Sequence, residues 1–108
     1  MKGQNTGYTE TLDALVVALC RDFERREEAM QGGSCTERTG MEYKYINLHM
    51  ADAAAEIAGE RLAPIYIDEI GTRTGYAHSR VDCVSETTYK EQKQSVKINI
   101  AKKLHLLD

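Results

Sequence analysis

Apolar side chains recur along much of this chain at the three- and four-residue spacing of an amphipathic α-helix. The first such stripe begins after Thr9 and comprises Leu12, Leu15, Val16, Leu19, Phe23 and Met30. It stops at the consecutive glycines 32 and 33, and glycine often ends a helix because it readily takes the left-handed backbone conformation. The pattern predicts one helix from about residue 9 to residue 32.

A second helical pattern covers residues 41–58 and is apolar around most of its circumference. One side carries Tyr43, Ile46, Met50, Ala53, Ala54 and Ile57, and the apolar arc is widened by Met41, Leu48, Ala51 and Ala55. The preceding residues, Ser34 to Glu37, have the spacing of a capping box, so we expect this helix to begin there. Because only a short loop separates the two helices, we expect them to form an antiparallel hairpin.

The rest of the chain predicts a short third helix and a longer last one. Gly59 and Pro64 favour a break after the second helix, with the third helix ending at Gly71. Residues 72–84 give a weak signal, in which the segment RVDCV at 80–84 alternates as a short strand would. The last helix is expected to begin at a second capping box, Thr88 to Glu91. Its apolar stripe contains Tyr89, Val96, Ile100, Leu104 and Leu107.

Together these patterns predict a single all-α domain over residues 1–108: a small bundle of three to four helices, with an N-terminal helical hairpin and a C-terminal amphipathic helix. Residues 1–7 are polar and are expected to form a flexible tail. The longest apolar run, at 14–20, is far shorter than the roughly 20 residues that cross a bilayer. We therefore expect a cytoplasmic protein without a membrane partner, whose three widely spaced cysteines are reduced thiols.

Charge is unevenly distributed along the chain. The formal net charge of -3 argues against a protein coated by nucleic acid or by an anionic membrane, because both attract basic surfaces. Residues 85–108 nevertheless carry +2, which leaves -5 for the first 84 residues. The last helix is thus expected to present a basic face.

One polar stripe on the second helix has the composition of a metal site. It consists of Glu42, Tyr45, His49, Asp52 and Glu56. Bundle metal sites draw their ligands from two or more helices, whereas these residues share one, so a solvated face is the favoured interpretation. His78 and His105 have no carboxylate nearby in the sequence that would orient a catalytic imidazole. We assign no catalytic, cofactor-binding or metal-binding residue and expect a protein that is not an enzyme.

Residues 65–84 resemble the helix-turn-helix of bacterial repressors. Gly71, Gly75 and Val81 occupy the positions of the small residue in the first helix, the glycine of the turn and the apolar plug of the second helix. The resemblance implies a recognition helix starting at Thr74 or Ala77. It also implies DNA contacts from Thr74, His78, Ser79 and Arg80, with Lys97 of the last helix on a phosphate.

The wider chain resembles short uncharacterised helical proteins encoded by bacteriophages and prophages. The residues that carry this resemblance are Leu19–Phe23 with Arg25 and Arg26, Met41–Tyr45, Asp52–Ile57, Glu69–Gly71 and Gly75–Ala77. The resemblance implies a phage-related context and leaves the activity open.

The leading hypothesis is a non-catalytic helical protein that acts by self-association or with a protein partner. The second helix has more apolar circumference than one neighbouring helix can cover, and excess apolar surface often marks an interface. The interface residues expected on this basis are Tyr43, Ile46, Met50 and Ile57. The alternatives are a DNA-binding phage regulator that uses residues 65–84 and a metal-dependent hydrolase that uses Glu42, His49, Asp52 and Glu56.

Overall fold

A computed structural model of the chain describes residues 7–33 and 35–107. Within these residues there are five α-helices, one 3-10 turn and no strand, which confirms the all-α fold and shows that residues 80–84 form no strand. The helices are α1 (Glu10–Arg21), α2 (Phe23–Gly32), α3 (Glu37–Ala58), α4 (Ala63–Thr72) and α5 (Glu86–Lys103), and the turn η2 spans Tyr76–His78. Residues 1–6 of the expected tail, and Ser34 of the expected capping box, lie outside the described residues.

The first predicted helix is divided in two at Asp22. Asp22 has a non-helical backbone, and its carboxylate accepts hydrogen bonds of 2.6 and 2.7 Å from the guanidinium of Arg25. The buried guanidinium of Arg26 fills the inside of the corner, where it donates to the carbonyl of Leu19 at 2.7 Å. Helix α2 thereby leaves the direction of α1 without a proline or glycine, and the single helix predicted over residues 9–32 was wrong.

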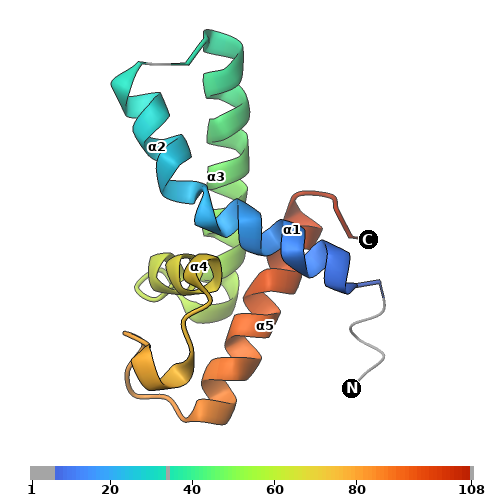
Figure 1. Cartoon of the computed structure of the whole chain (residues 1–108), viewed down its shortest axis with the longest axis vertical. Helices are drawn as coiled ribbons and strands as arrows, with labels where there is room; N and C mark the ends of the chain where they lie inside the picture. The colour runs from blue at the N-terminus through green and yellow to red at the C-terminus, as the bar shows by residue number, and fades with distance from the viewer. Residues whose placement is uncertain (1–6, 34, 108) are drawn as a thin grey trace.

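Helices α2 and α3 form the expected antiparallel hairpin, which makes the upper part of the molecule in Figure 1. Gly33 ends α2 in the left-handed conformation, as the glycine pair predicted. Thr36 caps α3, because its hydroxyl accepts a 3.2 Å hydrogen bond from the backbone N–H of Thr39. The helix consequently starts at Glu37.

The lower part of the molecule contains α4, η2 and α5 (Figure 1). Helix α4 has Pro64 in its first turn, where a missing N–H costs nothing, and it ends at Thr72. Helix α5 begins at Glu86, capped by Ser85, so the capping box expected at Thr88 was wrong. The earlier start adds the turn that carries Tyr89 into the core.

The core lies where α1, α3, α4 and α5 meet. Its buried side chains include Val16, Val17, Met50, Ala53, Ala54, Tyr66, Ile67, Ile70, Val96 and Ile100. Helix α3 packs against α2, α4 and α5, so the chain itself covers much of the arc that we expected to meet a partner. Met50 is fully buried, and Tyr43, Ile46 and Ile57 are half-buried. The expected interface face is therefore largely intramolecular packing.

Candidate functional site

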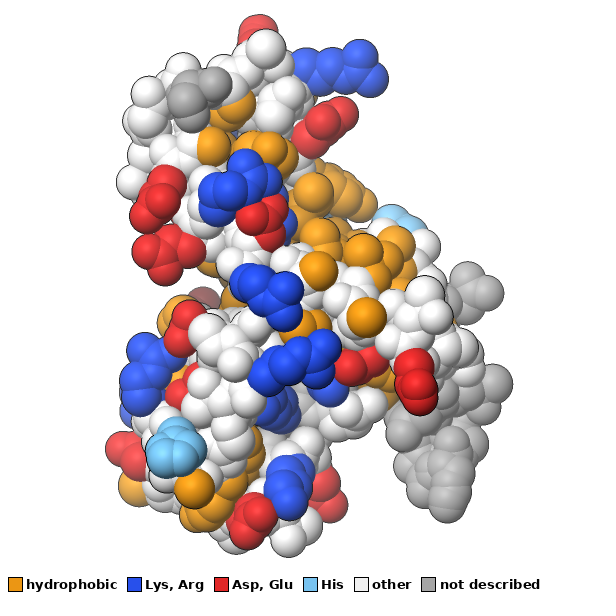
Figure 2. Space-filling view, viewed as in Figure 1, with side chains coloured by type: hydrophobic (Ala, Val, Ile, Leu, Met, Phe, Trp, Pro, Cys, Tyr) orange, Lys and Arg blue, Asp and Glu red, His pale blue; other side chains and the backbone are white. Residues whose placement is uncertain are grey.

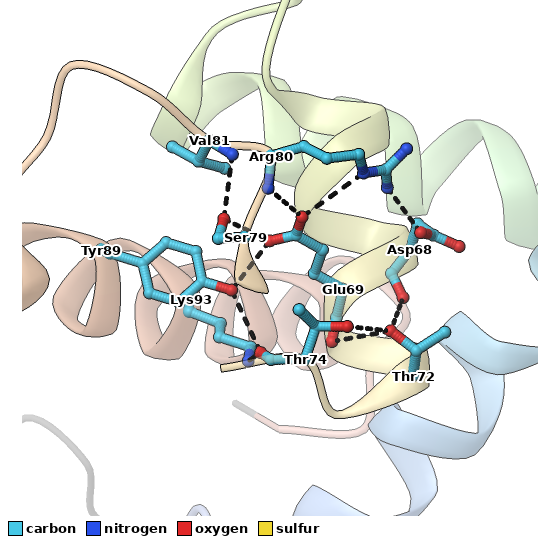
Figure 3. Close-up of polar contacts among 9 residues, drawn as sticks. All are labelled: Asp68, Glu69, Thr72, Thr74, Ser79, Arg80, Val81, Tyr89 and Lys93. Atoms are coloured by element: carbon cyan, nitrogen blue, oxygen red, sulfur yellow. Dashed lines mark hydrogen bonds and ion pairs between the residues drawn. The ribbon is translucent and has the colours of Figure 1, made fainter. Parts of the chain in front are cut away.

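The main polar cluster surrounds Glu69, which α4 carries into the core beside Ile70 (Figure 3). Glu69 is 1% exposed, and its carboxylate accepts three hydrogen bonds from outside α4. The Ser79 hydroxyl donates at 2.6 Å, the Arg80 backbone N–H at 2.7 Å and the Tyr89 hydroxyl at 2.8 Å. We call these four residues, Glu69, Ser79, Arg80 and Tyr89, the Glu69 cluster. The cluster joins α4 to the following segment and to α5.

Electrostatics keep Glu69 ionised in this cluster. Burial alone raises the pKa of its carboxyl group, but the hydrogen bonds from Arg80, Ser79 and Tyr89 outweigh burial and lower it. The pKa of Tyr89 is raised to about 12, first by burial and then by its hydrogen bond to Glu69. Glu69 therefore acts as a fixed acceptor of hydrogen bonds and Tyr89 as a donor.

The hydrogen bonds of the Glu69 cluster hold the segment after α4 in place. The Ser79 hydroxyl donates its proton to Glu69, and its oxygen accepts a 2.9 Å hydrogen bond from the N–H of Val81. The side chain of Arg80 pairs with Asp68 and lies 3.5 Å from Glu69. These bonds fasten residues 79–81 to α4, although the segment has almost no regular structure of its own.

The recognition helix implied by the repressor resemblance is not formed. Residues 76–78 make one 3-10 turn, and Ser79 continues with an extended backbone because Glu69 binds the next residues. His78 is exposed on η2, whereas the carbonyl of Thr74 accepts hydrogen bonds from Tyr89 and Lys93. The expected DNA-contacting residues thus share no helix, and Arg80 is held by two carboxylates.

Lys97 lies in a separate basic pocket of about 130 Å³ between α1, the end of α4 and α5. Its cationic lining is Arg73, Lys93 and Lys97, and its apolar lining is Val17 and Ile70. Lys97 pairs with Asp13 at 2.7 Å, and Lys93 donates to the carbonyl of Thr74. Burial lowers the pKa of Lys93, and the charge of Lys97 lowers it further. Of these three cations, only Lys97 was among the site residues predicted from the sequence.

A larger cleft of about 270 Å³ separates the α1–α2 corner from α4, at the left of Figure 2. Cys20, Phe23 and Ile67 are among its apolar lining residues, and Glu24 and Glu27 add carboxylates. The volume is slightly below the usual range for small-molecule sites.

The three thiols differ in access, which predicts an order of reaction with a thiol reagent. Cys83 is exposed, Cys35 is half-buried and Cys20 is buried in the core, where burial raises its pKa to about 12. We expect Cys83 to react first and Cys20 about a hundredfold more slowly, because labelling requires an accessible thiolate. Time-resolved labelling of the native protein followed by peptide mass spectrometry measures the order. Replacing Cys83 with Ser should remove the fastest phase only, and rapid labelling of Cys20 would contradict the core position.

The polar stripe of α3 does not converge on a metal site. His49 makes a 2.9 Å contact with the carbonyl of Tyr45, one turn earlier, and Glu56 binds Asn99 and Lys103 of α5. In residues 7–33 and 35–107 there is no grouping of three or more His, Cys, Asp or Glu side chains that could hold a metal ion. Nor does this part of the chain contain a helix with the length and apolar character needed to cross a membrane.

The outer face of α3 carries a row of exposed apolar side chains. Met41, Tyr45 and Leu48 are 68%, 45% and 53% exposed. Together with Arg38 and Asp52, which are exposed at either end, they follow the alternating three- and four-residue spacing of a coiled-coil seam. We call these five residues the α3 seam. Figure 2 shows exposed hydrophobic side chains beside the upper hairpin and across α1.

Three buried polar residues that organise the fold, Arg26, Asn47 and Glu69, were not predicted from the sequence. Arg26 is 2% exposed and donates to Asn47 at 2.6 Å, while Asn47 donates to the carbonyl of Phe23 at 3.1 Å. Glu69 lies among Tyr66, Ile67 and Ile70, so a carboxylate within an apolar stripe was the available signal. Arg26 has no such signal, because it lies within a run of charged residues.

No protein-family model matches the chain, and no curated protein or solved structure is similar to it. The resemblance to phage-encoded proteins stays a prediction, and function is argued from the residues of this chain alone.

Proposed function

We propose that this chain is a non-enzymatic protein that works by pairing with a second copy of itself along the α3 seam. The observation that carries the proposal is the exposure of Met41, Tyr45 and Leu48 in one row on the 22-residue helix α3. Large apolar side chains gathered on one exposed face are a common sign of an association surface. In Figure 1 the upper half of α3 is flanked by α2 on one side and is open on the other.

The charges of the α3 seam favour an antiparallel arrangement of two copies. Arg38 and Asp52 lie seven residues to either side of Tyr45. A two-fold axis at Tyr45 would therefore bring each Arg38 beside Asp52 of the other copy, and Met41 close to Leu48. A parallel pair would instead place like charges together at both ends, which costs free energy. The seam is complementary to itself in one orientation only.

The polar chemistry of the chain supports a role in association rather than catalysis. In the part of the chain that the structure describes, every buried side-chain nitrogen or oxygen has a hydrogen-bond partner. The hydroxyl and carboxylate groups of the Glu69 cluster are consumed in holding the fold together. The seam spans only about 21 Å of helix, at 1.5 Å per residue, so the expected dimer is small and reversible.

Sedimentation equilibrium over a concentration series tests the proposal. We expect the mass to rise from the 12.1 kDa of one chain toward twice that value. Tyr45→Glu places two carboxylates at the centre of the antiparallel pair and should weaken dimerisation about a hundredfold, because juxtaposed like charges cost several kcal/mol. The matched control is Leu106→Glu, since Leu106 is 40% exposed and lies outside the seam. A chain that stays monomeric throughout contradicts self-association.

Charge reversal tests the orientation of the pair. Arg38→Asp and Asp52→Arg should each weaken the dimer, because each creates two contacts between like charges. The double variant should recover the affinity of the natural sequence, and a mixture of the two single variants should form a heterodimer. Dimerisation that is insensitive to both single variants would place the contact elsewhere on the surface.

A further inference from the structure

The basic pocket gathers positive charge at one point of an acidic chain. Arg73 follows the last turn of α4, while Lys93 and Lys97 lie one turn apart on α5. Their side chains border one hollow, with Val17 and Ile70 as the apolar part of its wall. Like charges repel one another, so three cations around one hollow are stabilised by a nearby group of opposite charge.

The protein supplies only part of that opposing charge. Asp13 pairs with Lys97 at 2.7 Å, and Glu69 acts on Lys93 at longer range. The ammonium group of Lys93 donates one hydrogen bond to the carbonyl of Thr74 and has two further N–H groups that can donate. The guanidinium of Arg73 makes no hydrogen bond or ion pair with any of the described residues, and the charge of Asp13 acts on it at longer range. Hydrogen-bond donors that could bind an anion therefore remain on Arg73, at the end of α4, and on Lys93 of α5. These two residues face each other across the pocket.

We propose that the basic pocket binds a phosphate group through Arg73, Lys93 and Lys97. A phosphate dianion matches three cations of which one is already paired with Asp13. The planar guanidinium of Arg73 can donate two parallel hydrogen bonds to phosphate oxygens, and the ammonium groups can add single bonds from the opposite side. Val17 and Ile70 would exclude water from one side of the bound group, which strengthens these bonds.

This site is independent of the α3 seam. None of its lining residues belongs to α3, and Lys93 already touches the Glu69 cluster through its 5.3 Å approach to the ring centre of Tyr89. A bound phosphate would tie α5 to the end of α4 at the point where the Glu69 cluster also joins them. Ligand binding should therefore raise the stability of the segment that follows α4.

Titration of the full chain with inorganic phosphate, followed by amide chemical shifts at constant ionic strength, tests the proposal. We expect saturable shifts centred on Arg73, Thr74, Lys93 and Lys97. Arg73→Asn should weaken binding about tenfold, because it removes the bidentate donor. Asparagine tolerates the left-handed backbone of this position (φ 57°), and the change removes no side-chain bond of the folded protein, so the variant keeps its fold.

Lys102→Gln is the matched control, since Lys102 is an exposed cation of the same helix outside the pocket. It should bind phosphate as the natural sequence does. Lys93→Gln provides a second pocket variant and should also weaken binding. Equal affinities for Arg73→Asn and Lys102→Gln, or shifts spread evenly over the lysines of α5, would overturn the proposal, because both indicate general ionic screening.

A parallel titration with a short DNA duplex distinguishes two sources of the phosphate. Shifts at the same residues, at much lower concentration than with inorganic phosphate and falling steeply with salt, would assign the pocket to a nucleic-acid backbone. Absence of duplex binding, together with saturable binding of inorganic phosphate, would assign it to a small phosphorylated ligand. Binding of neither would refute the site.

Discussion

Replacing Glu69 with alanine is expected to lower the free energy of unfolding by about 3–5 kcal/mol, because three hydrogen-bond donors lose their acceptor at roughly 1–3 kcal/mol for each one that is buried. The deletion leaves the Ser79 hydroxyl, the Arg80 N–H and the Tyr89 hydroxyl without their shared acceptor. Each orphaned donor costs free energy, and the segment after α4 loses its main attachment to the core. Urea unfolding followed by circular dichroism measures the loss.

The loss of folding stability at low pH should depend partly on the same carboxylate. The folded-state pKa of Glu69 lies below its usual value of 4.5. A group with a lowered pKa stabilises the fold fully above its unfolded pKa, and that contribution disappears as pH falls through the folded pKa. We expect Glu69→Gln to flatten the pH dependence of stability below about pH 4.5, because glutamine does not titrate there.

Asp68 provides a matched control for both measurements. It is the neighbouring carboxylate and also pairs with Arg80, but its side chain is 55% exposed. Asp68→Ala should therefore cost less than about 1 kcal/mol, the ordinary range for an exposed ion pair. Equal costs for Glu69→Ala and Asp68→Ala would show that the hydrogen bonds of the buried network contribute little to stability.

Gly71→Ala is expected to destabilise the fold by about 2–3 kcal/mol, because α1 and α4 cross with their backbones in contact at this residue. A Cβ atom at position 71 would lie 2.6 Å from the backbone nitrogen of Arg21 and 2.7 Å from its Cα. Backbone atoms on another helix cannot move aside as a flexible side chain would. Thermal and urea unfolding of the variant measure the effect.

Gly40→Ala, in helix α3, is expected to have the opposite effect on folding stability. The nearest atom to its added Cβ is Cys35 Sγ, at an ordinary contact distance of 3.5 Å. Alanine should here stabilise the fold by about 0.5–1 kcal/mol, because it restricts the unfolded chain and favours the helix. Destabilisation by both variants would mean that helix crossing is not the reason for glycine at position 71.

Local patterns in the sequence were sufficient for most of the helices. The α5 stripe is a clear case, since Tyr89, Val96 and Ile100 are all buried as their spacing predicted. Gly59 and Pro64 marked the break before α4 because their backbone preferences act locally. The corner at Asp22 gave no such signal. Apolar spacing continues through it from Leu19 to Phe23, and the corner depends on contacts of Arg26 with residues of α3.

The polar sites were harder to predict from the sequence, because their residues come together only in the folded chain. Ser79 and Arg80 stood out as candidates for DNA contact, but their partner Glu69 lies ten residues away on another element. A local motif predicted a recognition helix, whereas buried hydrogen bonds to Glu69 hold the same residues extended. Arg73 and Lys93 went unnoticed because a pocket between helix ends has no periodic signature.

The packing of α1 against α4 and α5 has a consequence for how the chain reaches its fold during synthesis. Helix α1 is translated before the residues that cover its apolar face, and its crossing point joins Arg21 to Gly71, 50 residues later. The α2–α3 hairpin can form from neighbouring residues, but the core closes only after this long loop is bridged, which slows folding. Until α4 and α5 have both been made, the core side chains Val16 and Val17 of α1 lack part of their cover, and exposed apolar surface of this kind makes an incomplete chain prone to aggregation.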